Sequence, residues 1–301
     1  MKFSYFIAII IFSVSVIKAD ELDVVKQLQS TSVTIRAKNS EGSGVIKTRV
    51  LTNNNKEETV SYIWTAAHVT AGLRKTRTVI DGKSGATKTV VEFDDAQIIQ
   101  ELTEEGRRVG EIKMDAEVLR YSDADSNEDL CLLRVRKRNF VNKDVSVKFY
   151  LEDNIPPVGT ELYHCGSLLG QLGANSLTTG LISQHGRVLP NGKIFDQSSA
   201  VAFPGSSGGQ LSTKKDGKCV GLLVRGAGEG FNLYVPIRRI KIWAKKVGVE
   251  FALDDNVPVP SDDELKKYPL EDLNFASKTD EKTSGDTKFL IRELQKIDIN
   301  D

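Results

Sequence analysis

A serine flanked by glycines has the clearest chemical potential in this sequence. Residues 204–209 read Pro-Gly-Ser-Ser-Gly-Gly, with Ser207 two residues after Gly205 and directly before Gly208. A serine hydroxyl becomes a useful nucleophile when a base removes its proton and backbone N–H groups hold the oxyanion that forms. Because glycine lets the backbone bend sharply, the amides of Gly205 and Ser207 are expected to converge on one point. Taken alone, the segment is also compatible with a plain turn.

The base for such a serine would be a histidine, and the chain has 3 of them. His68 follows the small residues Thr-Ala-Ala at 65–67, which leave room for an imidazole at the end of a strand. His164 lies within a predicted strand, and His185 begins a turn with Gly186. A single histidine is more often structural than catalytic, so His68 gains weight only from its companions.

The third group is an acid that could orient the imidazole. Asp129 directly precedes the apolar run Leu-Cys-Leu-Leu at 130–133, which predicts a buried strand. Its carboxylate is therefore expected at the edge of the core, where it could accept the imidazole Nδ1–H and fix the tautomer. Asp123 and Asp125 are competitors, but their polar surroundings favour exposure to solvent.

The elements that must position these residues are short strands. Alternating apolar and polar residues recur between turns rich in glycine and asparagine, which predicts an all-β barrel or sandwich. The expected strands are 33–37, 45–51, 62–67, 88–93, 116–120, 130–135, 145–150, 161–165, 176–184, 198–202, 208–212, 219–225 and 232–236. Helices are expected at 22–28 and 237–247, the second stopped by Gly248.

Composition argues against several other functions. The 301 residues carry 41 basic and 41 acidic side chains, so the balance gives no reason to expect a nucleic-acid partner. The histidines are scattered without the spacing of metal ligands. The glycines between Gly226 and Gly230 lack the lysine and following helix of a phosphate-binding loop. We therefore expect neither a metal nor a cofactor.

The first 19 residues are typical of a secretory signal peptide. Lys2 precedes an apolar run at 3–17, and Ala19 offers a small residue before cleavage at Asp20. The run is short for a membrane span, so removal is favoured over an uncleaved N-terminal anchor. The mature protein is then expected to be secreted or periplasmic, without a stable membrane span.

Cysteine usage and the last 51 residues complete this picture. Cys131, Cys165 and Cys219 lie in apolar stretches and cannot all pair within one chain, although a bond between Cys165 and Cys219 remains possible. Residues 251–301 contain 13 acidic and 7 basic side chains, with prolines and little periodicity. They predict an acidic, largely disordered tail.

Together, the three segments resemble the signatures of trypsin-like serine peptidases. They are TAAHV at 65–69, DLCLL at 129–133 and PGSSGG at 204–209. Their order (His, Asp, Ser) is that of the chymotrypsin-type arrangement. Within the family, the sequence is most similar to the bacterial high-temperature-requirement (Deg-type) branch. The segments behind this likeness are GSGV at 42–45, GKCVG at 217–221 and FNLYVP at 231–236.

The resemblance implies a protease domain over 20–250 with two six-stranded antiparallel barrels. They would occupy about 20–140 and 141–236, with a closing helix at 237–247 and without the C-terminal peptide-binding domain of many relatives. The implied function is a serine endopeptidase that acts on polypeptides through His68, Asp129 and Ser207. Gly205 and Ser207 would form the oxyanion hole.

The resemblance also suggests a substrate preference. Val201 would lie at the base of the primary specificity pocket, with Leu223 and Val224 along its wall. Such an apolar pocket favours uncharged aliphatic residues, because a buried lysine or arginine would be unpaired there. Arg225 either favours an acidic group in a neighbouring subsite or is simply exposed. Residue 206 is serine rather than aspartate, so activity is expected without trimming beyond signal removal.

Two other functions could use the same fold. A catalytically silent protease fold could serve as a binding or scaffold module, and a non-peptidase hydrolase such as an esterase could share the triad.

Overall fold

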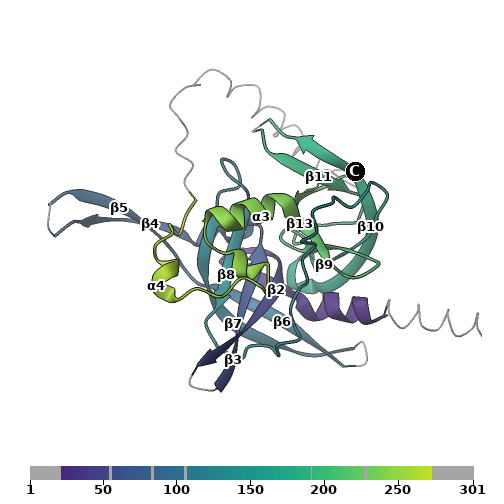
Figure 1. The fold of residues 1–301 in the computed structure, drawn as a ribbon, viewed down its shortest axis with the longest axis horizontal. Helices are drawn as coiled ribbons and strands as arrows, with labels where there is room; N and C mark the ends of the chain where they lie inside the picture. The colour runs from purple at the N-terminus through teal and green to yellow at the C-terminus, as the bar shows by residue number, and fades with distance from the viewer. Residues whose placement is uncertain are drawn as a thin grey trace, which may run out of the picture.

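Two closed barrels of antiparallel strands form the body of the chain, as predicted (Figure 1). The computed structural model describes residues 22–53, 56–82, 85–104, 107–190, 192–226 and 230–272. The predicted signal peptide at 1–19 and the last part of the predicted tail lie outside these ranges.

The first barrel has the strand order β1-β2-β3-β8-β7-β6. Its strands are β1 (Ser32–Ala37), β2 (Ser40–Asn53), β3 (Lys56–Thr65), β6 (Ala96–Glu104), β7 (Arg107–Ser122) and β8 (Leu130–Val135). Alternation of side chains along a strand turns residues such as Val33 and Ile35 into the buried interior. Closure pairs every strand on both sides, which removes exposed sheet edges.

The second barrel has the order β10-β11-β14-β13-β12-β9. Its strands are β9 (Glu161–Leu168), β10 (Gly173–Val188), β11 (Ile194–Ser198), β12 (Gln210–Thr213), β13 (Cys219–Gly226) and β14 (Asn232–Pro236). The predicted strand at 145–150 is absent: apart from an isolated bridge at Phe149, this segment is an irregular connection between the barrels.

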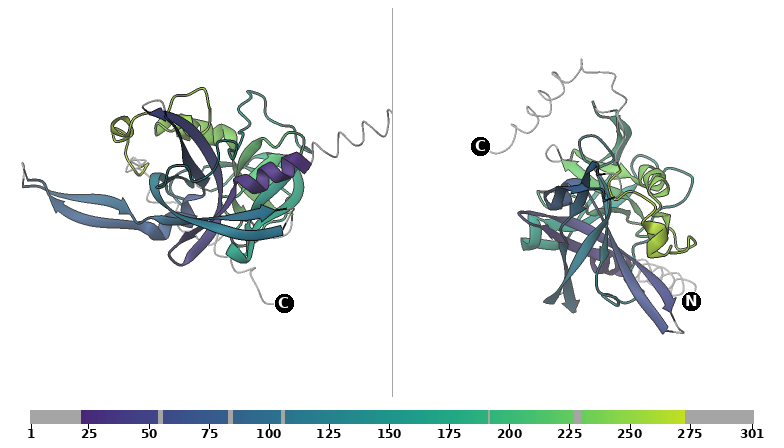
Figure 2. Two further views of the ribbon diagram at one scale, coloured as in Figure 1. Left: turned by 90° about the horizontal axis from the view of Figure 1, so that it is seen from below. Right: turned by 90° about the vertical axis from the view of Figure 1, so that its left-hand side faces the viewer.

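A hairpin of two exposed strands, β4 (Arg74–Ile80) and β5 (Thr87–Phe93), projects from the first barrel (Figures 1 and 2). The sequence pattern predicts β5 but neither β4 nor β6. In β4, charged residues and threonines alternate without an apolar face, so it lacks the burial pattern that marks a core strand.

The helices are short and lie on the barrel surfaces. A helix at 22–31 places Leu28 against Tyr163 and Cys165 of the second barrel. The remaining ones are α2 (Ala67–Thr70), η1 (Ala71–Leu73), η2 (Gly170–Leu172), α3 (Ile237–Lys246), η3 (Glu250–Ala252) and α4 (Asp262–Leu265). Helix α3 buries one face, including Ile240 and Trp243. Within the described ranges, none of the helices has both the length and the apolarity needed to cross a membrane.

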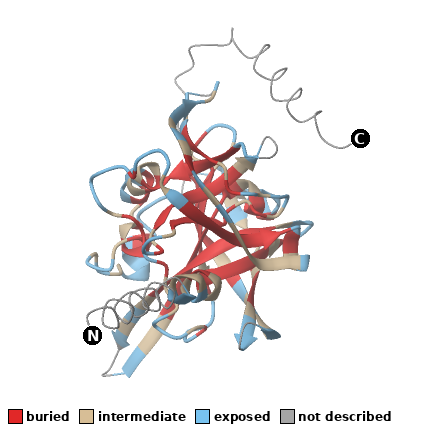
Figure 3. Cartoon of the chain, turned by 90° about the vertical axis from the view of Figure 1, so that its right-hand side faces the viewer, coloured by how far each residue is buried: buried red, intermediate tan, exposed pale blue. Residues whose placement is uncertain are grey.

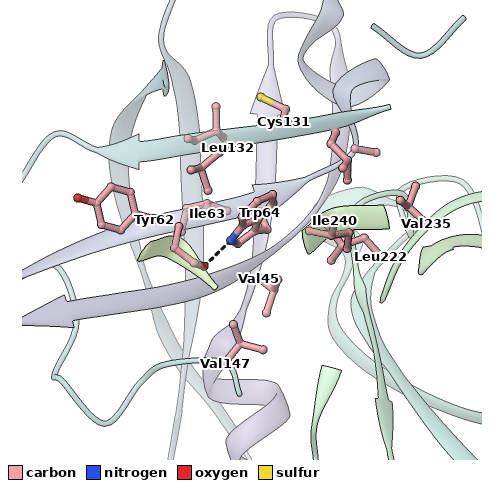
Figure 4. Close-up of a cluster of buried hydrophobic side chains, with 14 of the residues drawn as sticks. Val45, Tyr62, Ile63, Trp64, Cys131, Leu132, Val147, Leu222, Val235 and Ile240 are labelled. Atoms are coloured by element: carbon pink, nitrogen blue, oxygen red, sulfur yellow. Dashed lines mark hydrogen bonds between the residues drawn. The ribbon is translucent and has the colours of Figure 1, made fainter. Parts of the chain in front are cut away.

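One apolar core extends through both barrels (Figure 3). Trp64 of β3 packs edge-on against Trp243 of α3, with ring centroids 5.8 Å apart. Its indole nitrogen donates to the carbonyl of Ala252 at 2.7 Å (Figure 4). All three cysteines are buried and free, and burial raises the pKa of each thiol to about 12. They therefore serve as packing residues rather than nucleophiles.

Residues 251–272, which the sequence analysis assigned to a disordered tail, are folded against the first barrel. Phe251, Ala252 and Leu253 are buried. The Arg49 guanidinium of β2 donates to four carbonyl groups in this segment, those of Phe251, Asp254, Asp255 and Val257. The folded part of the chain therefore extends beyond residue 250. The acidic composition of this segment made its few buried apolar residues difficult to recognise from the sequence.

Candidate active site

His68 and Asp129 meet because they follow and precede paired strands. β3 ends at Thr65, β8 begins at Leu130, and Thr65 pairs with Cys131. The His68 Nδ1 atom lies 3.0 Å from both carboxylate oxygens of Asp129. The His68 backbone N–H also donates to Asp129 Oδ1 at 3.1 Å. Both the ring and the backbone of His68 are therefore fixed by one carboxylate.

The two partners differ in exposure. The Asp129 side chain is 1% exposed, whereas that of His68 is 37% exposed. Asp129 has a φ of 56°, a left-handed conformation that aspartate tolerates better than most residues. Since Nδ1 faces Asp129, Nε2 lies on the other side of the ring, away from the buried acid. The arrangement suits an imidazole that exchanges a proton through Nε2.

Ser207 lies in the turn between β11 and β12, at the boundary between the barrels. Its carbonyl accepts from the backbone N–H of Ser43 in β2 at 2.8 Å. Gly208 has a φ of +85°, and a Cβ there would lie 2.2 Å from Thr65 Oγ1. Glycine at 208 thus lets the serine turn contact the end of β3, three residues before His68.

The amides of Gly205 and Ser207 are the candidate donors of an oxyanion site. The Pro204 carbonyl accepts from Leu169 N–H at 2.7 Å. In a trans peptide the carbonyl and the N–H point in opposite directions, so the Gly205 N–H points away from Leu169. In the described part of the chain, neither the Gly205 nor the Ser207 amide donates a hydrogen bond. Two donors are therefore available beside the serine hydroxyl.

Ser43 is a site residue whose role the sequence analysis missed. It is buried in β2, where its hydroxyl donates to the Gly205 carbonyl at 2.7 Å and accepts from Ser167 N–H at 2.7 Å. Together with its backbone bond to Ser207, these contacts fix the serine turn to the first barrel. The motif Gly-Ser-Gly-Val at 42–45 could have pointed to it, because a buried hydroxyl between two glycines needs partners.

The Ser206 side chain forms a hydrogen bond within its own turn. It is buried, and its hydroxyl accepts from the backbone N–H of Phe203 at 3.1 Å. Residue 206 therefore supplies a hydroxyl rather than a carboxylate next to Ser207.

The predicted specificity residues are not equivalent. Val201 is 42% exposed, and the neighbouring Phe203 is 52% exposed. Leu223 and Val224 are buried in the core, and the backbone of Leu223 bonds to that of Gly208 and Gly209. Leu223 therefore supports the serine turn through its main chain, whereas Val201 presents apolar surface to solvent.

Arg225 is half-buried between the two barrels. Its Nη2 donates to the Ala124 carbonyl at 3.2 Å, in the loop that leads to Asp129. Its Nε is buried without a partner, and no carboxylate binds it within the described ranges. The guanidinium thus brings an unpaired positive charge to the inter-barrel boundary.

The other two histidines lie elsewhere. His164 is fully buried in β9, where its Nδ1 lies 3.1 Å from the Gln210 carbonyl, and burial lowers its pKa to about 4. His185 lies between Asp196 and the Pro156 carbonyl, each 2.9 Å away. In the described ranges, no cluster of three histidine, cysteine or acidic side chains is arranged to hold a metal ion.

Comparisons with known proteins agree with this fold. A family profile described as trypsin-like peptidase domain matches residues 42–222. Among solved structures, the chain is similar to an HtrA-type protease, AlgW, determined as a Ser-to-Ala variant with a tripeptide. The two are 19% identical with a TM-score of 0.51, over 77% of this chain and 64% of that one, less than two thirds of the AlgW chain.

Two further structures show the same likeness. Deg5 is 18% identical with a TM-score of 0.52, over 79% of this chain and 97% of its own. An inactive-form Ser-to-Ala mutant of Rv3671c from M. tuberculosis H37Rv is 17% identical with a TM-score of 0.50, over 79% and 93%. A search of curated protein sequences finds no match. At these identities the structures establish a shared fold.

Proposed function

The chain belongs to the trypsin-like peptidase family, and we propose that it is a serine endopeptidase with Ser207 as nucleophile, His68 as base and Asp129 as orienting acid. One observation carries the proposal. The buried Asp129 carboxylate holds His68 Nδ1 at 3.0 Å, beside a serine turn that is bonded to the same barrel.

The proposed mechanism follows from these positions. His68 Nε2 takes the hydroxyl proton while Ser207 Oγ attacks a peptide carbonyl carbon. The amides of Gly205 and Ser207 donate to the oxyanion, and Asp129 stabilises the imidazolium. His68 then gives its proton to the leaving amine. Water attacks the acyl-enzyme with the same base, which releases the acid and restores Ser207.

The hydrogen bond between Ser207 and His68 is proposed to form when substrate binds. In the described part of the chain, the Ser207 hydroxyl makes no hydrogen bond. Catalytic hydrogen bonds often tighten only in the substrate complex. Rotation about the Ser207 χ1 angle is the step proposed to bring Oγ to His68 Nε2.

The exposed apolar side chains near the site favour uncharged residues before the scissile bond. Val201 and Phe203 supply that surface, and burying a lysine or arginine against apolar side chains is costly when its charge is unpaired. Arg225 adds an acidic preference one or more positions further from the bond. It shares a row with Leu233 and Gln197 across β13, β14 and β11. The Arg187 guanidinium, bound to Gln197 Oε1 at 2.9 Å, adds charge to the same row.

Polypeptides are the proposed substrates. We also propose that residues 1–19 are removed as a signal peptide, so that the mature enzyme is secreted or periplasmic. N-terminal sequencing of the purified mature protein tests this, and a start at Asp20 is expected.

Labelling with a fluorophosphonate probe tests the proposed function. Wild-type protein should be labelled and should cleave unfolded casein, whereas Ser207→Ala should do neither. Equal silence of both proteins would favour a binding or scaffold module, and labelling without casein cleavage would favour an esterase. A peptide-library profile then reads the specificity. For Arg225→Gln, the preference for acidic over neutral peptides should fall roughly tenfold.

A further inference from the structure

The last described residues contact both segments that carry the His68–Asp129 pair. Residues 270–272, here named the C-terminal strap, lie beside the end of β7. Tyr121 N–H donates to the Leu270 carbonyl at 2.9 Å, and Asp272 N–H donates to the Tyr121 carbonyl at 2.8 Å. This short parallel pairing places two acidic side chains, Glu271 and Asp272, next to the site.

Asp272 holds the loop that ends at Asp129. Its backbone carbonyl accepts from Asn127 Nδ2 at 2.5 Å. Its buried carboxylate accepts from Ser122 Oγ at 3.4 Å, and Ser122 Oγ in turn accepts from Glu128 N–H at 3.0 Å. The residue directly before Asp129 is therefore linked to the strap through one hydroxyl.

The Asp272 carboxylate is itself fixed by α3. Trp243 Nε1 donates to Oδ2 at 3.2 Å, and Lys246 Nζ lies 2.7 Å from Oδ1. Because the carboxylate is buried, these donors offset much of the cost of its desolvation. The loop before Asp129 is thus linked to α3, which follows the second barrel in the chain.

Glu271 holds the segment that follows His68. Its carboxylate accepts two hydrogen bonds from the Arg74 guanidinium, from Nε at 3.0 Å and from Nη2 at 2.8 Å. Arg74 directly follows the helical turns α2 and η1, the first of which contains His68. A paired guanidinium and carboxylate fix orientation as well as distance.

We propose that the C-terminal strap is a positioning element for catalysis: Glu271 and Asp272, adjacent in sequence, set the His68 segment and the Asp129 loop relative to each other. The proposal rests on the proposed function, because the pair that it positions is the catalytic one. A hydrogen bond made by two side chains on separate segments depends on the relative position of those segments. An error of about 1 Å can lower turnover by up to about a hundredfold.

The test compares substitutions that weaken the contacts of the strap with a control substitution that removes another contact of residues 251–272. Glu271→Gln weakens the Arg74 contact, Asp272→Asn weakens the Ser122 and Lys246 contacts, and a double variant combines them. Asp255→Asn is the matched control, because it removes the ion pair of Asp255 with Lys47 in β2. For each protein, kcat and KM on a peptide substrate, the melting temperature and the downfield NMR resonance of the His68 Nδ1 proton are measured.

We expect the double variant to lose roughly ten- to a hundredfold in kcat with KM within about twofold. The NMR resonance of its His68 Nδ1 proton should weaken or shift, whereas Asp255→Asn should lower only the melting temperature. Unchanged kcat and an unchanged Nδ1 resonance in the double variant would overturn the proposal. Should the double variant not fold, Glu271→Gln alone decides on the same two readouts. If the wild type hydrolyses no peptide, the proposed function fails, and the NMR readout still decides whether the strap positions the pair.

Discussion

Single side chains at the boundary between the barrels determine whether the amides of the serine turn can converge on one point. The geometry of the Gly205 amide depends on the carbonyl that follows it, and Ser43 Oγ binds that carbonyl. Without the hydroxyl, the carbonyl of Gly205 and the N–H of Ser167 both lose a partner in a buried setting. The turn could then relax into a form whose amides no longer converge.

Ser43→Ala should therefore impair turnover more than substrate binding. We expect kcat to fall roughly ten- to a hundredfold, because oxyanion stabilisation acts in the transition state. Ser61→Ala is the control, since the Ser61 hydroxyl is equally buried in the same barrel but has no hydrogen-bond partner among the described residues. Steady-state kinetics on one peptide distinguishes the two variants. Equal kcat values for them would show that the Ser43 hydroxyl does not hold the turn.

The sequence indicated the residues with distinctive types, and it missed those with ordinary ones. His68, Asp129 and the glycines around Ser207 stood out because their chemistry or backbone freedom is rare. Ser43 and Glu271 are common polar residues, and their importance comes from partners distant in the chain. Whether Ser207, His68 and Asp129 act together stays a prediction until the labelling experiment is done.

Among the elements, the segment after α3 changes the boundary of the domain. Its buried residues complete the first barrel, since Ala252 accepts from Trp64 Nε1. Arg120 of β7, itself buried, donates to the carbonyls of Val247 and Leu265, which lie just after α3 and in α4. Without the segment, the buried donors of Trp64 and Arg120 would lose these hydrogen-bond partners.

A chain ending at residue 249 should consequently fold poorly compared with one ending at residue 272. Losing the burial of Phe251 and Leu253 costs about 1.5–3 kcal/mol for each side chain. Unpairing a buried charge such as Lys47 adds about 3–5 kcal/mol, which together approaches the whole stability of a typical domain. Thermal unfolding followed by circular dichroism measures this. Matching transitions for the two chains would mean that the segment is dispensable.

Element prediction from the sequence succeeded for strands that are buried along their length and failed for a strand that is exposed. β8 and β14 have the predicted bounds because nearly all of their residues are buried. β4 is exposed along its length and has no apolar face to reveal it. The segment at 251–272 was assigned to disorder because it combines many acidic residues with prolines and has little periodicity, although its apolar residues pack.

The whole molecule should lose stability at mildly acidic pH because of one buried imidazole. Burial lowers the pKa of His164 from 6.5 to about 4. Between these values the unfolded chain binds a proton that the folded chain does not. The stability is therefore fully present above about pH 6.5 and falls with pH by about 3 kcal/mol in total down to pH 4.

Urea unfolding of wild type and His164→Asn at pH 7 and pH 4.5 measures this dependence. Asparagine keeps a donor for the Gln210 carbonyl and does not titrate, so the free energy of unfolding should depend less on pH in the variant. If the free energy of unfolding falls equally in both proteins between pH 7 and pH 4.5, the pH dependence comes from other groups.

The order in which the chain is made differs from the order in which it can be completed. A ribosome builds the strands of the first barrel early, but the residues that cover Trp64 and pair with Lys47 come after the entire second barrel. Until residue 255 has been added, Trp64 and Lys47 of the nascent first barrel lack these partners. Translation stalled before that point would therefore leave fragments that expose apolar surface to chaperones.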